Sequence, residues 1–229
     1  FREAGPRALA AAIADGDVAR INAALPGAGD LNRQVPTNRT YYVPLGDSAT
    51  FLTFALERAD ESDGFAEVIR ALLAAGANPN VPRGQPLAAA IALSTRAIEL
   101  LLAADADVNA DNGAGGLVWW NVLEVGDRSS RDVTRLQMLL DHGADTRYRN
   151  ASGQGPIELA VEGERWNAIL LLAQHIPGAK DVVIGRNVNT GQEGETVHAR
   201  LAREVQSLKA RGQPIPEAMR AALAFFDAL

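Results

Sequence analysis

The sequence predicts an all-α protein in which short helix pairs stack as a solenoid. A nine-residue segment occurs three times, at 72–80 (LLAAGANPN), 101–109 (LLAADADVN) and 139–147 (LLDHGADTR), and a weaker copy stands at 23–32. A second pattern, a proline followed by a large apolar residue and small residues, precedes the leucine pair in two of the units. Two motifs that recur in a fixed order are typical of a repeat architecture, whose units bury their apolar faces against one another.

Each copy of the nine-residue segment is expected to end a helix. The leucine pair completes an apolar helical face, and Gly76 or Gly143 just beyond it can adopt the left-handed conformation that closes a helix at low steric cost. The Asn and Asp residues that follow suit a tight turn. Each copy therefore predicts a helix end that leads into an exposed loop.

The second pattern predicts where the first helix of a unit begins. Pro86 and Pro156 are suited to a first helical turn, where a missing N–H costs nothing, and Thr50 is suited to cap a helix that begins at Phe51. The alanines that follow allow neighbouring helices to approach closely. The corresponding stretches at 7–12 and 116–122 match the pattern less well.

These two motifs resemble the T-P-L-H-x-A and L-L-x-x-G-A-D-x-N signatures of ankyrin-repeat proteins. The copies lie 29 residues (105 minus 76) and 38 residues (143 minus 105) apart, on either side of the roughly 33-residue ankyrin period. The resemblance covers about five units within residues 1–174. One family feature is absent, because the histidine position holds Thr53, Ala88, Trp119 or Glu158.

Other parts of the chain depart from the repeat. Polar residues at 59–64 and 126–132 predict lengthened turns within the second and fourth units. Residues 176–194 are expected to form an extended loop, and apolar spacing predicts helices at 195–211 and 216–229. Residues 175–229 are therefore interpreted as a helical cap that belongs to the same domain as the repeats and covers the last apolar face.

Composition narrows the classes of partner and location. The net charge of −6 disfavours nucleic-acid binding, which depends on Lys and Arg, and no apolar run is long enough to cross a bilayer. Lys180 and Lys209 are the only lysines, a bias towards arginine that suggests a bacterial source. The absence of cysteine and a first residue other than Met fit a cleaved export signal, so a periplasmic or exported location is expected over a cytoplasmic one.

No residue pattern indicates catalysis, a metal or a cofactor. His142, His175 and His198 are spread over different units without a second ligand at metal spacing, and structural or solvated roles are expected for them. The Gly-rich segments NGAGG and SGQG have no P-loop lysine, and no G-x-S-x-G motif occurs. The chain is therefore not expected to be an enzyme.

The resemblance implies that a partner protein is bound at the last exposed positions of the first helices and at the loop tips. The expected partner-binding residues are Asp15, Glu57, Arg58, Leu93, Trp120, Glu124 and Glu162 on the helices, and Tyr41 and Tyr42 in the long segment 31–50. The four carboxylates would form an acidic stripe that attracts a basic partner. The alternative is that they are ordinary solvated charges.

The sequence thus predicts a protein-interaction module, monomeric when unbound, that binds and inhibits a partner, as an immunity protein or inhibitor does. Two alternatives stay open. The first is an enzyme that uses a pair of groove carboxylates such as Glu124 with Glu162, and the second is a scaffold fragment of a larger effector.

Overall fold

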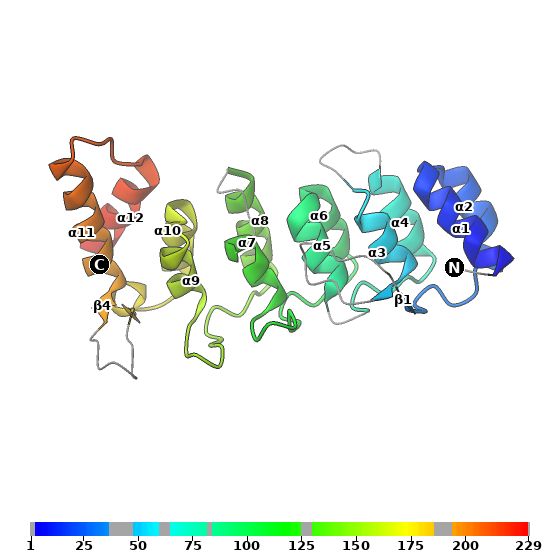
Figure 1. The fold of residues 1–229 in the computed structure, drawn as a ribbon, viewed down its shortest axis with the longest axis horizontal. Helices are drawn as coiled ribbons and strands as arrows, with labels where there is room; N and C mark the ends of the chain where they lie inside the picture. The colour runs from blue at the N-terminus through cyan, green and yellow to red at the C-terminus, as the bar shows by residue number, and fades with distance from the viewer. Residues whose placement is uncertain are drawn as a thin grey trace. The chain divides into compact units, whose positions relative to one another are not determined.

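The computed structural model describes residues 3–36, 48–59, 65–81, 84–124, 130–185 and 194–228. Most of these residues are helical, and the few strands are two residues long, so the all-α prediction is confirmed. The chain divides into two compact units, one made of residues 1–125 with 141–144 and the other of residues 126–140 with 145–229. The fold is drawn in Figure 1.

Unit 1 consists of helix pairs arranged in two layers. Its helices are α1 (Ala4–Asp15), α2 (Val18–Ala24), α3 (Phe51–Leu56), α4 (Ala66–Ala74), α5 (Gln85–Leu93), α6 (Thr95–Leu102) and α7 (Asn121–Glu124). The first helices α1, α3, α5 and α7 contact one another in that order, and so do the second helices α2, α4 and α6 (Figure 1). Within unit 1, the helices of the first three pairs pack against their partners, and counterparts of successive pairs pack against each other.

The helix boundaries follow the capping residues that the sequence supplies. Thr50 and Thr53 form a reciprocal capping box at the start of α3, and the Ser94 hydroxyl accepts a hydrogen bond from the Ala97 amide at the start of α6. Pro86 lies in the first turn of α5, as its position in the motif predicts. These local signals start the helices, and burial of side chains such as Leu52 and Leu87 between the layers holds them together.

The loops between pairs are joined by a ladder of asparagine side chains. Asn32 Oδ1 accepts from the Asn78 amide at 2.7 Å, and Asn32 Nδ2 donates to the Gly76 carbonyl at 3.3 Å. Asn80 repeats the pattern one pair later, accepting from the Asp107 amide at 2.7 Å and donating to the Asp105 carbonyl at 2.9 Å. Asn109 in turn donates to the Gly143 carbonyl at 2.9 Å. We call Asn32, Asn80 and Asn109 the asparagine ladder.

The turn before each rung has a repeated geometry as well. The side chains of Asp30, Asn78, Asp107 and Asp145 each accept from the backbone amide two residues later, at 2.8 to 2.9 Å. The four copies of the nine-residue segment therefore adopt the same turn, although the first was recognised only as a weak copy. Close packing of the loops also explains Gly84, whose φ is 73° and where a Cβ atom would lie 2.7 Å from the Cβ of Ala110.

Two pairs of short antiparallel strands occur among the described residues. In unit 1, β1 (Val35–Pro36) pairs with β2 (Ser48–Ala49), and α3 begins directly afterwards. In unit 2, β3 (Val183–Ile184) pairs with β4 (Glu195–Thr196), and α11 begins directly afterwards. The expected extended loop at 176–194 thus holds a short helix, η4 (Ala179–Asp181), and the strand β3 within its described residues.

Unit 2 contains the remaining helices. They are α8 (Ser130–Asp141, whose last residue is counted with unit 1), α9 (Pro156–Glu162), α10 (Trp166–His175), α11 (Val197–Ala210) and α12 (Glu217–Asp227). α12 packs against both α10 and α11, and its inward residues Met219, Ala222 and Phe226 are buried. The two helices expected at 195–211 and 216–229 are therefore present, and α12 covers α10.

One local prediction is wrong. Residues 126–132 were expected to form a polar turn, but α8 begins at Ser130, so Asp132 lies in a helix. Its side chain is buried and lies 3.5 Å from the Arg165 guanidinium. An acidic residue in the first turn of a helix is favoured by the helix dipole, and here it also has a buried partner distant in sequence.

Candidate functional site

The candidate surface in unit 1 is the set of C-terminal ends of the first helices. α1 ends at Asp15, Glu57 caps α3, α5 ends at Leu93 and α7 ends at Glu124. Because these helices contact one another in sequence and lie side by side in Figure 1, their ends form one edge of the unit. We call Glu57, Leu93 and Glu124, which belong to three successive helices, the helix-end surface.

Leu93 is the apolar part of this surface. It is 37% exposed, and among the described residues only Val183 in unit 2 is another large hydrophobic side chain recorded as exposed. Its neighbours along α5, including Leu87 and Ile91, are buried. A single exposed leucine is common on protein surfaces, so its importance depends on the charged groups beside it.

Glu57 and Glu124 give the surface its negative charge. Glu57 is half-buried and Glu124 is exposed at the end of its helix. Partial burial raises the pKa of the Glu124 carboxyl above its usual value. Both carboxylates also lie at helix C-termini, where the helix dipole adds negative potential.

The basic residue of this edge is held against its own helix. The Arg58 guanidinium lies 3.6 Å from the centre of the Phe54 ring, and its Nη1 donates to the Phe54 carbonyl at 2.9 Å. A cation over an aromatic face is a favourable arrangement. Arg58 therefore covers Phe54 at the border of the helix-end surface.

The other two predicted carboxylates make contacts of their own. Asp15 is exposed and forms an ion pair with Arg20 of α2. Glu162 belongs to unit 2, where Gln154 Nε2 donates to both of its carboxylate oxygens, at 2.9 and 3.1 Å. The acidic stripe is therefore divided between two units, and its full extent stays a prediction.

The aromatic residues do not all meet expectation. Trp120 was expected to contact a partner, but it is only 1% exposed and packs edge-on against Trp119, with ring centres 6.3 Å apart. Gly116 lies directly against its indole, since a Cβ atom there would be 2.6 Å from Trp120 Cε3. Trp120 is thus a core residue of unit 1 and offers no binding surface. Tyr41 and Tyr42 lie outside the described residues.

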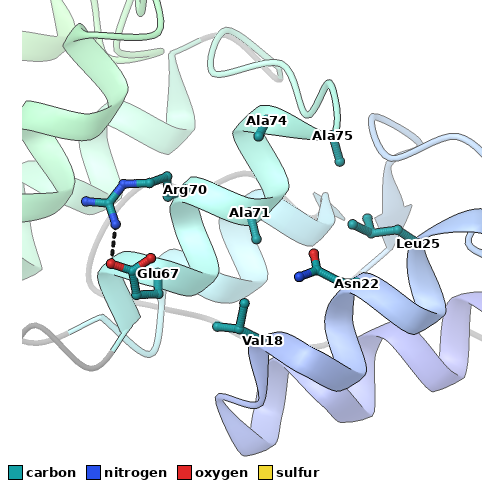
Figure 2. A pocket seen from close by; sticks show the side chains of 8 residues that line it. All are labelled: Val18, Asn22, Leu25, Glu67, Arg70, Ala71, Ala74 and Ala75. Atoms are coloured by element: carbon teal, nitrogen blue, oxygen red, sulfur yellow. Dashed lines mark hydrogen bonds and ion pairs between the residues drawn. The ribbon is translucent and has the colours of Figure 1, made fainter.

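A hollow lies between α2 and α4, in the layer of unit 1 that the second helices form. Figure 2 shows its lining, in which Val18, Asn22 and Leu25 face two alanines of α4 and the alanine that caps it across an open depression. The Glu67–Arg70 ion pair stands at one end of the depression. The small alanine side chains account for the hollow, and this surface provides a comparison for experiments on the helix-end surface.

Sequence reasoning missed a group of buried charges in unit 2. Glu158 is 7% exposed, and one of its oxygens lies 3.7 Å from Arg149 Nε. Asp132 pairs with Arg165, and Arg135 is 6% exposed. Glu158 occupies the position where the ankyrin signature has histidine, so a charged residue at a buried motif position was the available signal. Each of the two buried carboxylates thus lies beside an arginine of the same unit.

The histidines occupy helix ends and surfaces. His175 Nδ1 lies 2.8 Å from the Leu171 carbonyl in the last turn of α10, and His198 Nε2 lies 2.8 Å from the Asp227 carboxylate. Within the part of the chain that the structure describes, no three His, Cys, Asp or Glu side chains are grouped so that they could hold a metal ion. None of the described helices has the length and apolar character required to span a bilayer.

Comparison with models of known protein families and with curated proteins finds no match to this chain.

Proposed function

We propose that this chain is an ankyrin-type repeat protein that binds a partner protein through the C-terminal ends of its first helices and its loop tips. The observation that carries the proposal is the asparagine ladder, because its rungs repeat the same side-chain contacts from one helix pair to the next. A repeated contact of this kind fixes successive loops and helix ends in register. A rigid, regular surface favours tight binding, since little conformational entropy is lost on association.

The proposed partner is a protein with a basic contact region. The helix-end surface combines one exposed leucine with two carboxylates at helix C-termini. An apolar contact provides affinity, and complementary charge raises the association rate and excludes acidic competitors. Inhibition of an enzyme or toxin, as by an immunity protein, is the outcome we propose for such binding.

Selection of peptides from a random library tests the proposal. The immobilised full chain is panned against displayed twelve-residue peptides, and each enriched peptide is synthesised and measured against three forms of the chain. These are the unaltered chain, a Leu93→Asp variant of the helix-end surface, and an Ala74→Glu variant that fills the hollow between α2 and α4. Both substitutions are at exposed positions, so both variants are expected to fold.

The expected result is a set of peptides whose affinity falls at least tenfold with Leu93→Asp and is unchanged by Ala74→Glu. If the enriched peptides respond only to Ala74→Glu, the binding surface is the hollow, and the helix-end surface has no such role. Failure to enrich any peptide that responds to Leu93→Asp would also refute the proposal.

A further inference from the structure

The loop from Asp111 to Leu117 in unit 1 contains an asparagine that is followed by glycine. Its two ends form an isolated antiparallel bridge, and the Asn112 amide donates to the Gly116 carbonyl at 3.0 Å. Asp111 and Gly113 are exposed and Asn112 is half-buried, so water reaches this loop. No other Asn-Gly pair occurs in the sequence. We call this loop the Asn112 tip.

An asparagine side chain can react with the backbone nitrogen of the next residue. The nitrogen gives up its proton and forms a bond to Cγ, and the side-chain NH2 group takes up a proton and leaves as ammonia. The resulting five-membered succinimide ring then takes up one water. Cleavage between the nitrogen and Cγ gives aspartate, whereas cleavage between the nitrogen and the backbone carbonyl carbon gives isoaspartate. Glycine in the next position favours the attack, because no Cβ atom crowds the nitrogen.

The hydrogen bonds of the Asn112 tip act on both reacting groups. The Gly113 amide nitrogen, which is the nucleophile, donates to Asp111 Oδ1, so a carboxylate is in place to accept its proton. Asn112 Oδ1 accepts from the amides of Ala114 at 2.8 Å and Gly116 at 3.0 Å. These two donors draw electron density from Cγ and stabilise the negative charge that the oxygen gains when the nitrogen attacks.

The loop at Asn150 in unit 2 has the same hydrogen bonds without the glycine. Asn150 Oδ1 accepts from the amides of Ser152 at 3.0 Å and Gln154 at 2.9 Å, and the Asn150 amide donates to the Gln154 carbonyl at 2.9 Å. The residue that follows Asn150 is Ala151, and the residue that precedes it is Arg149. The two loops therefore share the donors to the side-chain oxygen and differ in the nucleophile and in the carboxylate beside it.

We propose that Asn112 is a site of spontaneous deamidation, in which the Gly113 nitrogen attacks Cγ and Asp111 accepts the proton. This inference is independent of the proposed partner binding. Aspartate at position 112 has two acceptor oxygens, so it can keep both hydrogen bonds of the tip while adding a negative charge. Isoaspartate lengthens the main chain by one carbon in a loop whose Gly116 lies against Trp120, so this product is expected to disturb the tip.

Timed incubation of the folded full chain in a mildly alkaline buffer tests the proposal. Samples are digested, and the peptides that contain Asn112 and Asn150 are quantified by mass spectrometry, with separation of the aspartate and isoaspartate products. Asn112 is expected to be lost at least tenfold faster than Asn150. Equal rates at the two positions, or faster loss at Asn150, would overturn the inference.

Variants of the two loops test the assigned roles. Asp111→Ala removes the proton acceptor and is expected to slow the loss of Asn112 at least threefold, and Gly113→Ala is expected to slow it at least fivefold. Because Gly113 has a φ of 77°, which strains alanine, Ala151→Gly provides the reciprocal test. It is expected to speed the loss of Asn150 at least threefold. An unchanged rate at Asn112 in Asp111→Ala, or unchanged rates in both variants that alter the glycine, would show that the inference is wrong.

Discussion

The side chain of Asn80 is hydrogen-bonded to the backbone amide of Asp107 at 2.7 Å, although 27 residues separate the two along the chain. The same side chain donates to the Asp105 carbonyl at 2.9 Å. One amide group thus satisfies a donor and an acceptor of the next loop. Polar backbone groups that would otherwise depend on water are paired within the protein.

Replacement of Asn80 by alanine is expected to lower the free energy of unfolding of unit 1 by about 1 to 3 kcal/mol, since two hydrogen bonds worth roughly 0.5 to 1.5 kcal/mol each are lost. Urea denaturation monitored by circular dichroism measures the change. Asn22→Ala is the control, because Asn22 is exposed on α2 beside the hollow. An Asn80→Ala variant as stable as Asn22→Ala would show that the ladder contributes nothing to stability.

Truncation of Trp120 to alanine is expected to destabilise the protein by about 3 to 5 kcal/mol, the usual cost of emptying a buried aromatic site. The ring is 1% exposed and packs against Trp119 and Gly116. Thermal unfolding should show a markedly lower melting temperature. A variant with normal stability and lost partner binding would instead restore the role in binding that the sequence suggested.

The Arg149 side chain that contacts Glu158 lies directly against Gly155. A Cβ atom at Gly155 would lie 1.8 Å from the guanidinium of Arg149 and displace it. Gly155→Ala and Arg149→Ala are each expected to cost about 1 kcal/mol, a value kept low because the Arg149 side chain is 36% exposed.

The double variant decides whether these two effects share one cause. If the alanine at position 155 acts by displacing Arg149, the double variant is expected to be no less stable than the worse single variant. Denaturant unfolding of all four proteins gives the coupling energy. Additive losses of stability would mean that Gly155→Ala acts on the local backbone conformation, independently of Arg149.

The pH dependence of stability should carry a signature of Glu124. Burial raises its pKa in the folded protein, so between the unfolded value near 4.5 and the higher folded value the native state binds more protons than the unfolded state. Ionisation of Glu124 therefore lowers the free energy of unfolding as pH rises through that window. Glu124→Gln is expected to melt at a higher temperature than the unaltered chain at pH 7, and this difference should vanish below pH 4.5.

Glu195 provides the opposite control for this measurement. Hydrogen bonds from Arg203 and Arg200 lower the pKa of Glu195 in the folded protein. The ionised carboxylate therefore stabilises the fold above about pH 4.5, and this stabilisation is lost as pH falls through the folded-state pKa. Glu195→Gln should therefore reduce stability slightly at pH 7. If Glu124→Gln lowers the melting temperature at pH 7, as Glu195→Gln is expected to do, the burial effect at Glu124 is absent.

The features that sequence predicted are those encoded locally. Pro86 and Thr50 mark helix starts because each acts on its own first turn, and Gly76 marks a helix end because its φ of 94° suits glycine. Asp105, with φ of 61°, takes the same place without being glycine. The motif around Asp105 is still recognisable, because it contains the leucine pair and the final Asn of the other copies.

The features that sequence missed depend on residues far apart in the chain. Asp132 is helical and buried, and it pairs with Arg165, 33 residues later (165 minus 132). Trp119 and Trp120 are adjacent, so a helix turns them to different faces, and only one was expected to be buried. Both are buried in the short 3₁₀ helix η3 (Val118–Trp120), so protein surrounds this helix on more than one face. On the candidate surface, sequence identified the helix ends correctly, but only the structure showed that Arg58 covers Phe54 and that Gln154 holds Glu162.

The asparagine ladder also makes the chain modular at the level of whole units. Asn32 and Asn80 form the same two bonds to the following loop, so each junction has interchangeable donor and acceptor groups. A helix pair bounded by two rungs carries its own connectors at both ends. Duplication or removal of such a pair would leave matching hydrogen-bonding groups at the new junction. The number of helix pairs, and with it the number of positions that can contact a ligand, could therefore change while every interface between pairs stayed the same.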